Sequence, residues 1–110
     1  MGAQPFIVQA EGETMFDALR NAADYAKHQY GHAGYTGTIA EKDTVVEIEC
    51  GDVPLPTLDQ AVEHANRLID EGDERIEDKW GPAGAIGVWR NDDANRPVRA
   101  GWVLFGWASS

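Results

Sequence analysis

Three polar residues of one segment have side chains that could hold a metal ion, because Asp24, His28 and His32 stand four residues apart. On a continuous helix this spacing aligns a carboxylate and two imidazoles along one face, as in a zinc site. Gly31 is expected to end the helix before His32, which breaks the alignment. A solvated His28 and a hydrogen-bonded His32 in a loop are the favoured interpretation, and neither a metal nor a cofactor is expected.

Nucleophilic or acid-base catalysis finds little support in the rest of the chain. The single cysteine, Cys50, closes a strand-like run and has no accompanying motif. Adjacent carboxylates such as Asp70 and Glu71 lack the alternating spacing of a calcium loop and the partners of an acid-base pair. The sequence therefore predicts a protein that is not an enzyme.

Two glycine-rich segments share the pattern Gly-x-Ala-Gly-x-x-Gly, at residues 31–37 and 81–87, and each follows an aromatic residue, Tyr30 or Trp80. A phosphate-binding loop opens a helix, because the free backbone N–H groups lie at its start. Here the glycines follow helix-like stretches, where carbonyl groups are exposed and the helix dipole is negative. These segments are expected to be helix-to-strand joints.

An alternative function stays open for the same segments. The hydroxyl, imidazole and aromatic side chains of residues 30–38 and 80–84 could together form a site for a small molecule or a nucleotide. Its candidate ligand-binding residues are His32, Tyr35, Thr36, Thr38 and Trp80.

Acidic residues are concentrated in one stretch of the chain, whose net charge is −10. Residues 41–78 contain thirteen acidic residues against three basic ones, which accounts for the whole net charge. Such a field repels nucleic acid directly and favours a protein partner with a basic, nucleic-acid-binding surface. A role in solubility or in adaptation to a salty solvent is the open alternative. The candidate protein-binding acids are Asp59, Glu63, Asp70, Glu71, Asp73, Glu74, Glu77 and Asp78.

The C-terminal strand-like run, residues 99–107, is apolar on both alternating faces. If both helices covered one side of the sheet, the other side would need a partner, such as a second copy of the chain or another protein. Trp102, Phe105 and Trp107 are the candidate apolar contacts. The alternative is that residues 73–80 cover that side, with Trp80 and Trp89 filling it. In that connector Ile76 and Trp80 are expected to turn inward.

Periodicity and capping residues predict the elements that position these groups. Thr14 and Thr57 open two apolar-periodic helices, which Gly31 and Gly72 close. Alternating or β-branched runs predict the strands, and residues 91–97 are rich in turn formers. The expected elements are strand 6–10, helix 14–30, strand 34–40, strand 44–50, helix 57–71 and a hairpin of strands 85–90 and 98–107.

This order, βαββαββ, predicts an α+β fold with a duplicated half. A repeated unit of strand, capped helix, glycine-rich joint and strand is the pattern of the ferredoxin-like two-layer sandwich, in which two helices cover one face of an antiparallel sheet. The last strand would be an addition to that fold. The 110 residues suffice for one domain, 1–110.

The chain shows neither a signal peptide nor a transmembrane segment, and its one cysteine excludes an internal disulfide. A cytoplasmic location is expected, which is the host cytoplasm if the protein belongs to a bacteriophage.

The segments GHAGYTGTIAEK at residues 31–42 and DKWGPAG at residues 78–84 resemble small proteins of bacteriophages and other mobile elements. The resemblance covers about twenty of the 110 residues. It implies a small accessory protein that acts by binding, such as an acidic inhibitor that mimics DNA on a host protein. It implies no particular site residue.

Overall fold

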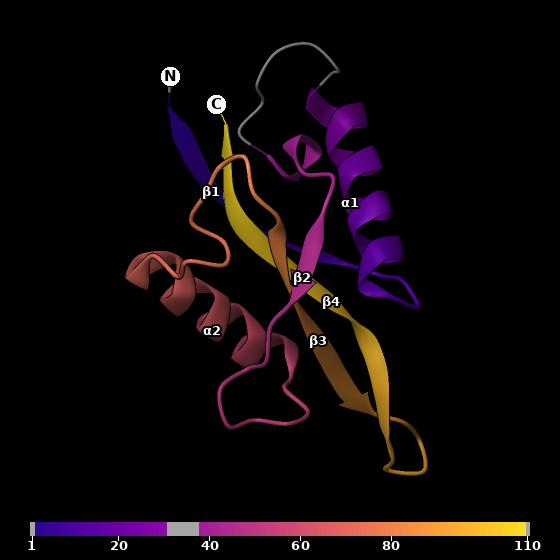
Figure 1. The fold of residues 1–110 in the computed structure, drawn as a ribbon. Coiled ribbons are helices and arrows are strands. Elements are labelled where there is room, and N and C mark those ends of the chain that lie inside the picture. Colours follow the sequence, from indigo (N-terminus) through magenta and orange to yellow (C-terminus); the bar gives the residue numbers. More distant parts are fainter. Residues whose placement is uncertain (1, 31–37, 110) are drawn as a thin grey trace.

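The computed structural model describes residues 2–30 and 38–109, and it shows an α+β chain with two helices and one four-stranded sheet. The predicted α+β class is confirmed, whereas the order βαββαββ is not matched (Figure 1). The elements in chain order are β1 (Ala3–Ala10), α1 (Met15–Tyr30), the 3-10 turn η1 (Ile39–Glu41), β2 (Val45–Glu47), α2 (Leu58–Glu71), β3 (Ala83–Asn91) and β4 (Pro97–Ser109).

Both predicted helix starts are confirmed by their caps. The hydroxyl of Thr14 accepts a hydrogen bond from the N–H of Asp17 at 3.1 Å. Thr57 and Gln60 form a complete capping box, with bonds of 3.3 and 3.0 Å between side chains and backbone. Gly72 ends α2 in the left-handed conformation (φ 70°), where an L side chain would be strained.

The predicted strands between the helices are largely wrong. Residues 39 and 40 of the expected strand 34–40 belong to the 3-10 turn η1, which Thr38 caps, and residues 31–37 lie outside the described residues. The expected strand 44–50 shortens to β2, because the chain turns away near Gly51 (φ 57°) after the N–H of Ile48 has bonded the carbonyl of Ala85.

The sheet order is β1-β4-β3-β2. β4 pairs antiparallel with both β1 and β3, while β2 runs parallel to β3. The predicted hairpin of the last two strands is confirmed, and its turn projects beyond the helices (Figure 1). β1 and β2 therefore form the two edges of a mixed sheet.

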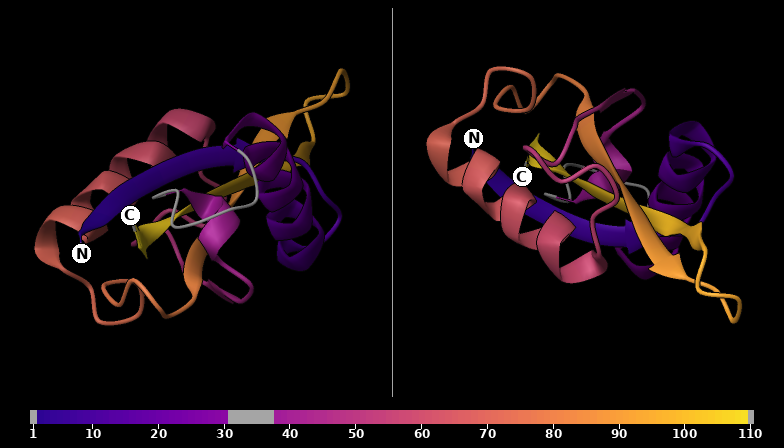
Figure 2. Two further views of the ribbon diagram at one scale, coloured as in Figure 1. Left: turned by 90° about the horizontal axis from the view of Figure 1, so that it is seen from above. Right: turned by 90° about the horizontal axis from the view of Figure 1, so that it is seen from below.

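The two helices lie on opposite faces of this sheet. α1 connects β1 to β2 across the whole sheet, and α2 returns from β2 to its neighbour β3, so the two crossovers run in opposite directions. Two crossovers of the same handedness lie on opposite faces of a sheet when they run in opposite directions across it. Crossovers between parallel strands are almost always right-handed. Figures 1 and 2 show a helix on either side of the strands.

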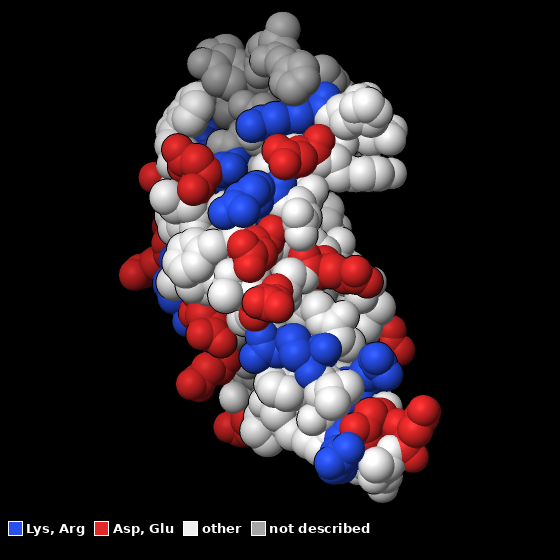
Figure 3. All heavy atoms as spheres, turned by 90° about the vertical axis from the view of Figure 1, so that its right-hand side faces the viewer, with Lys and Arg blue, Asp and Glu red and all other residues white. Residues whose placement is uncertain are grey.

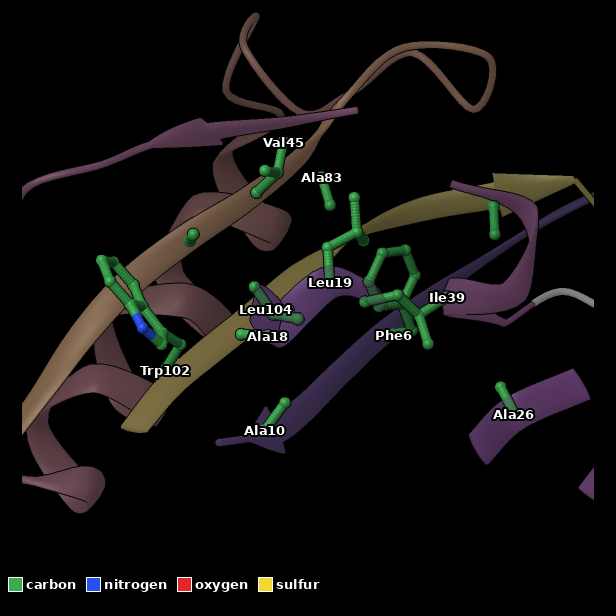
Figure 4. Close-up of a cluster of buried hydrophobic side chains, with 12 residues drawn as sticks. Phe6, Ala10, Ala18, Leu19, Ala26, Ile39, Val45, Ala83, Trp102 and Leu104 are labelled. Carbon is green, nitrogen blue, oxygen red and sulfur yellow. The ribbon is translucent and has the colours of Figure 1, made fainter. Parts of the chain in front are cut away.

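Each face carries its own hydrophobic core. On the α1 side, Leu19 and Ile39 pack against Phe6 and Leu104 (Figure 4). The second core lies between α2 and the other face, and its members include Ala61, Ala65, Leu68, Ile69, Ile76, Ile86, Val103 and Phe105. Successive residues of β4 alternate between the two cores, which is the pattern of a strand covered on both sides.

The expected placement of both helices on one face is therefore wrong. The second apolar face of β4 is covered by α2, together with Ile76 of the following connector, which is fully buried. The predicted inward position of Ile76 is confirmed. The inward position predicted for Trp80 is wrong, since 62% of its surface is exposed. The sheet faces thus give no argument for a homodimer.

The second glycine-rich segment enters β3. Gly81 accepts and donates hydrogen bonds at the turn, and Gly84 already lies within the strand opposite Phe105. The first copy, residues 31–37, lies outside the described residues. The proposed equivalence of the two segments stays a prediction.

Candidate protein-binding surface

The outward face of α2 carries a row of carboxylates. Ala61, Ala65 and Leu68 face the sheet, because they repeat at helical spacing and are almost completely buried. The opposite side of α2 is exposed, and its acidic residues are Asp59, Glu63, Asp70 and Glu71. Arg67 is the one basic residue of α2, and its guanidinium lies 3.7 Å from Glu63. The structure thus brings these four predicted acids together.

Two of the predicted acids in the connector have structural roles. Both Asp73 oxygens bind Arg75, at 2.9 Å from its backbone N–H, Nε and Nη2. These hydrogen bonds lower the pKa of Asp73 to about 2. Asp78 accepts a 2.9 Å bond from the N–H of Trp80. Glu74 and Glu77 are exposed and continue the acidic row from α2.

Two further carboxylates, absent from the predicted set, lie near α2 at the β2 edge of the sheet. Glu47 and Glu49 are exposed and line a shallow hollow with His64, Leu68 and Arg75. Their alternation with buried residues along the strand was the signal that places them on one wet side. We use the term acidic surface for Glu47, Glu49, Asp59, Glu63, Asp70, Glu71, Glu74 and Glu77.

Exposed apolar residues lie before and at the start of α2. Val53, Leu55 and Leu58 are between 36% and 43% exposed, in the segment that leads into the capping box. They adjoin Asp59 in sequence at the N-terminal end of the acidic surface. Their exposure was not predicted from the sequence, because loop residues have no periodicity to reveal it.

Two of the three predicted aromatic contacts, Trp102 and Phe105, do not lie at the surface. Trp102 is 4% exposed and Phe105 is completely buried, in the cores on opposite faces of the sheet. Trp107 is half-buried against the α2 core. The indole N–H of Trp102 donates to the carbonyl of Gly12 at 3.2 Å, and Arg99 stacks on its ring at 4.3 Å.

The alternative ligand site is described only in part, since His32, Tyr35 and Thr36 lie outside the described residues. The hydroxyl of Thr38 accepts the N–H of Ala40 at 3.2 Å. Trp80 is exposed, with Nζ of Lys79 lying 5.5 Å from its ring centroid. Thr38 and Trp80 thus have roles in local structure.

A buried lysine fixes the segment between Asp78 and Gly81. Nζ of Lys42 donates to the carbonyls of Asp78, Lys79 and Gly81 at 3.3, 3.0 and 2.8 Å. Burial lowers the pKa of Lys42, while the nearby carboxylates of Asp78 and Asp43 oppose that shift. The Lys42 ammonium therefore links the start of the second glycine-rich segment, by hydrogen bonds, to the chain that leads into β2.

A pocket of about 470 Å³ lies where β2 leaves the sheet. Its lining includes Glu47, Glu49, Asp52, Trp89 and Arg99.

Cys50 also lines this pocket, although its side chain is buried, and its Sγ lies 3.6 Å from the carbonyl oxygen of Gln60. Burial raises the pKa of the thiol, which disfavours the nucleophilic thiolate. This geometry gives the pocket no activated nucleophile at Cys50.

Among residues 2–30 and 38–109, no three His, Cys, Asp or Glu residues are grouped closely enough to hold a metal ion. Within the same residues, neither helix is long and apolar enough to cross a membrane. Comparisons with protein families, with curated proteins and with solved structures found no match to this chain.

Proposed function

We propose that the protein binds a partner protein with a basic surface through its acidic surface. The observation that carries this proposal is the separation of charge between the two helices. α2 has four acidic residues and one basic residue, and exposed Glu47, Glu49, Glu74 and Glu77 flank it in the chain. α1 is balanced, with Asp17 and Asp24 against Arg20 and Lys27.

The α1 side provides the internal comparison. Figure 3, which views the molecule from that side, shows Lys and Arg interleaved with Asp and Glu. A charge excess that served solubility alone would need no such segregation. A one-sided negative field instead steers a basic partner toward one face and orients it during encounter.

The apolar part of the contact is assigned to Val53, Leu55 and Leu58, in place of the buried Trp102 and Phe105. Charged groups at the rim govern the rate and the salt dependence of association, while apolar side chains contribute to the affinity that salt does not remove. The partner class that fits is a nucleic-acid-binding protein, whose basic site the acidic surface would occupy in place of DNA or RNA. The resemblance to proteins of mobile elements is compatible with such an inhibitor.

A displacement assay tests the proposal. Labelled duplex DNA is bound to protamine, used as a defined basic probe, and the protein is added at 50 and 300 mM NaCl. The wild type is expected to release DNA, less effectively at the higher salt concentration. The variant Asp59→Asn, Glu63→Gln, Asp70→Asn, Glu71→Gln is expected to need about tenfold more protein at low salt.

The matched control removes the same number of charges elsewhere, by Glu13→Gln, Asp17→Asn, Asp24→Asn and Asp93→Asn. It is expected to behave like the wild type. If both variants lose activity equally, overall charge rather than the acidic surface is responsible. A wild type that releases no DNA at 50 mM NaCl contradicts the proposal.

The alternative function, a small-molecule or nucleotide site of residues 30–38 and 80–84, stays a second hypothesis. A thermal-shift screen with nucleotides and divalent metals tests it. Shifts that Thr36→Ala or His32→Ala abolishes would support this site, and unchanged melting curves would remove it.

A further inference from the structure

β1 is an edge strand whose outer side is not paired. It borders β4 on one side, and no strand in the described part of the chain pairs with the other side. An open edge offers a row of backbone donors and acceptors to another strand. Which residues of β1 offer them follows from the hydrogen bonds at the far end of the sheet.

The hydrogen bonds between β2 and β3 show to which side each residue of β3 directs its N–H and C=O groups. The N–H of Ile48 donates to the carbonyl of Ala85 at 2.8 Å, so Ala85 directs its backbone groups toward β2. Backbone groups of successive strand residues point to opposite sides of the strand. Gly84 and Ile86 therefore direct theirs toward β4.

The same alternation carries the direction across β4 to β1. The β4 partners of Gly84 and Ile86 are Phe105 and Val103, which therefore direct their backbone groups toward β3 and away from β1. β1 places Ile7 opposite Phe105 and Gln9 opposite Val103. Opposed residues of an antiparallel pair either both point inward or both point outward. The N–H and C=O groups of Ile7 and Gln9 consequently face the open edge.

Pro5 lies on the same outward set, two residues before Ile7, and this explains how β1 accommodates it. Proline has no N–H, and on an edge strand its nitrogen is tolerated on the open side. β1 carries no charged side chain from Ala3 to Ala10. The lysines with which many edge strands prevent pairing are therefore absent.

A groove runs along this edge. It has a volume of about 850 Å³ and is lined by residues 5–11 of the β1 segment and by Asn21, Ala22, Tyr25 and Ala26 of α1. Tyr25 is 68% exposed beside it. In the part of the chain that the structure describes, Glu11 is the one charged residue that lines the groove. The edge thus combines unpaired backbone groups with a largely uncharged wall.

We propose that a second copy of the chain occupies this edge, with the two β1 strands antiparallel and a twofold axis passing between the two Ile7 residues. A twofold axis that pairs two edge strands antiparallel in one sheet is perpendicular to that sheet. The two α1 helices then lie on one face of the joined sheet, and the two α2 helices lie on the other. The product is a continuous sheet through two copies.

The proposed register follows from the position of Pro5. With the axis at Ile7, the two Ile7 residues exchange both backbone bonds, and Gln9 donates to the carbonyl of Pro5 in the other copy. Ala3 and Glu11 form the outer pair. Pro5 is thus used only as an acceptor. In this register the Gln9 carbonyl opposite Pro5 has no donor, but the pair at the axis keeps both of its bonds. A register centred on Phe6 instead places Pro5 opposite Ile7, so that the hydrogen-bonded pairs next to the axis each lose a bond.

The lack of charged side chains on β1 fits a second copy of the same uncharged strand better than a basic partner at this edge. The proposed register sets each Glu11 opposite Ala3, so no two carboxylates are opposed, and the central pairs are uncharged. The net charge of −10 makes two copies repel at long range, so salt should strengthen the dimer. This dependence is opposite to that of the proposed basic partner, so the two proposals fail independently.

Analytical ultracentrifugation of the full chain at 10–200 µM in 50 and 500 mM NaCl tests the dimer. A dimer of twice 12.0 kDa is expected, with tighter association at 500 mM NaCl. Gln9→Pro removes an outward N–H without touching a bond to β4, and it should raise the dimer dissociation constant at least about tenfold. Gln9→Val keeps the N–H and should leave the dimer intact.

Hydrogen exchange at single amides tests the dimer on the wild-type chain, so its result does not depend on whether a variant folds. In the dimer, the amides of Ile7 and Gln9 should gain protection as protein concentration rises, whereas those of Phe6 and Val8 are protected by β4 at all concentrations. A monomer at 200 µM in both salts, or a dimer in which Ile7 and Gln9 exchange freely, overturns the proposal.

Discussion

Gly84 lies directly against Phe105, so that a Cβ atom at Gly84 would be 2.7 Å from Cζ of the ring. The same Cβ atom would be 2.8 Å from Cδ1 of Ile48. Both neighbours are buried in the α2 core and have no room to move aside. This contact, between β3 and β4, explains why one position of the second glycine-rich segment requires glycine.

Gly84→Ala is therefore expected to lower the free energy of unfolding by about 2 kcal/mol, as overpacking of a core does. Urea denaturation followed by tryptophan fluorescence measures the change. Gly87→Ala is the comparison on the same strand. Its Cβ would meet the guanidinium of Arg99, the end of a flexible side chain, at 3.2 Å, so it should cost at most the contact of Arg99 with the two tryptophan rings, about 1 kcal/mol. Equal stability of Gly84→Ala and wild type would contradict the packing described here.

The hydrogen bonds of Asp73 predict an acid-dependent loss of stability. Its pKa is about 2 in the folded chain against an ordinary 3.8, so the folded state releases this proton more readily than the unfolded state. The stabilisation is complete above pH 3.8 and is lost as the pH falls toward 2. Because Arg75 is half exposed, the ion pair of Asp73 with Arg75 stabilises the folded state by only about 1 kcal/mol.

Asp73→Asn tests this relation. The variant should be less stable than the wild type by about 1 kcal/mol at pH 7, and the difference should vanish near pH 2. Urea titrations at pH 7, 4, 3 and 2 give the difference directly. Asp70→Asn, on the exposed face of α2, is the control and should change stability little at any of these pH values. A difference independent of pH would refute the role of the Asp73 carboxylate.

Removing the buried ammonium of Lys42 should be costly. Lys42→Met keeps the aliphatic stem but removes the ammonium donor from the carbonyl groups of Asp78, Lys79 and Gly81. Within the described residues, only the carbonyl of Asp78 keeps another donor, the N–H of Gly81. A loss of about 2 kcal/mol in the free energy of unfolding is expected. Lys79→Met removes an exposed bond of 3.4 Å to the carbonyl of Gly2 and should cost much less. Similar losses of stability in Lys42→Met and Lys79→Met would contradict this role of the Lys42 ammonium.

Local chemistry made several elements predictable. Thr57 and Gln60 specify the start of α2 through side chains three residues apart, and Gly72 specifies its end through backbone conformation. The turn residues between β3 and β4 likewise define a hairpin, whose strands are neighbours in sequence. The acids of α2 follow from the same helical periodicity, because the face opposite Ala61 and Ala65 must be exposed.

Long-range pairing was not predictable in this way. The parallel contact of Val45 with Ala83 joins segments far apart in sequence, and no residue of either strand announces its partner. The run from Trp102 to Phe105 was apolar on both faces, which indicates a central strand covered on both sides. A contact surface is the wrong interpretation of this run, because the faces that the helices occupy depend on crossover direction, which the local sequence does not contain.

Arg99 connects the hairpin to the core, since its guanidinium lies 4.6 Å from the ring of Trp89 and 4.3 Å from that of Trp102. Arg99→Ala should lower the free energy of unfolding by about 1 kcal/mol and shift the tryptophan emission, because both rings lose a cation that covers them. Arg99→Lys keeps the charge but not the planar stacking, so it should restore only part of the loss. Arg90→Ala, exposed on the same hairpin, is the control. An unchanged emission spectrum in Arg99→Ala would show that the stack does not persist in solution.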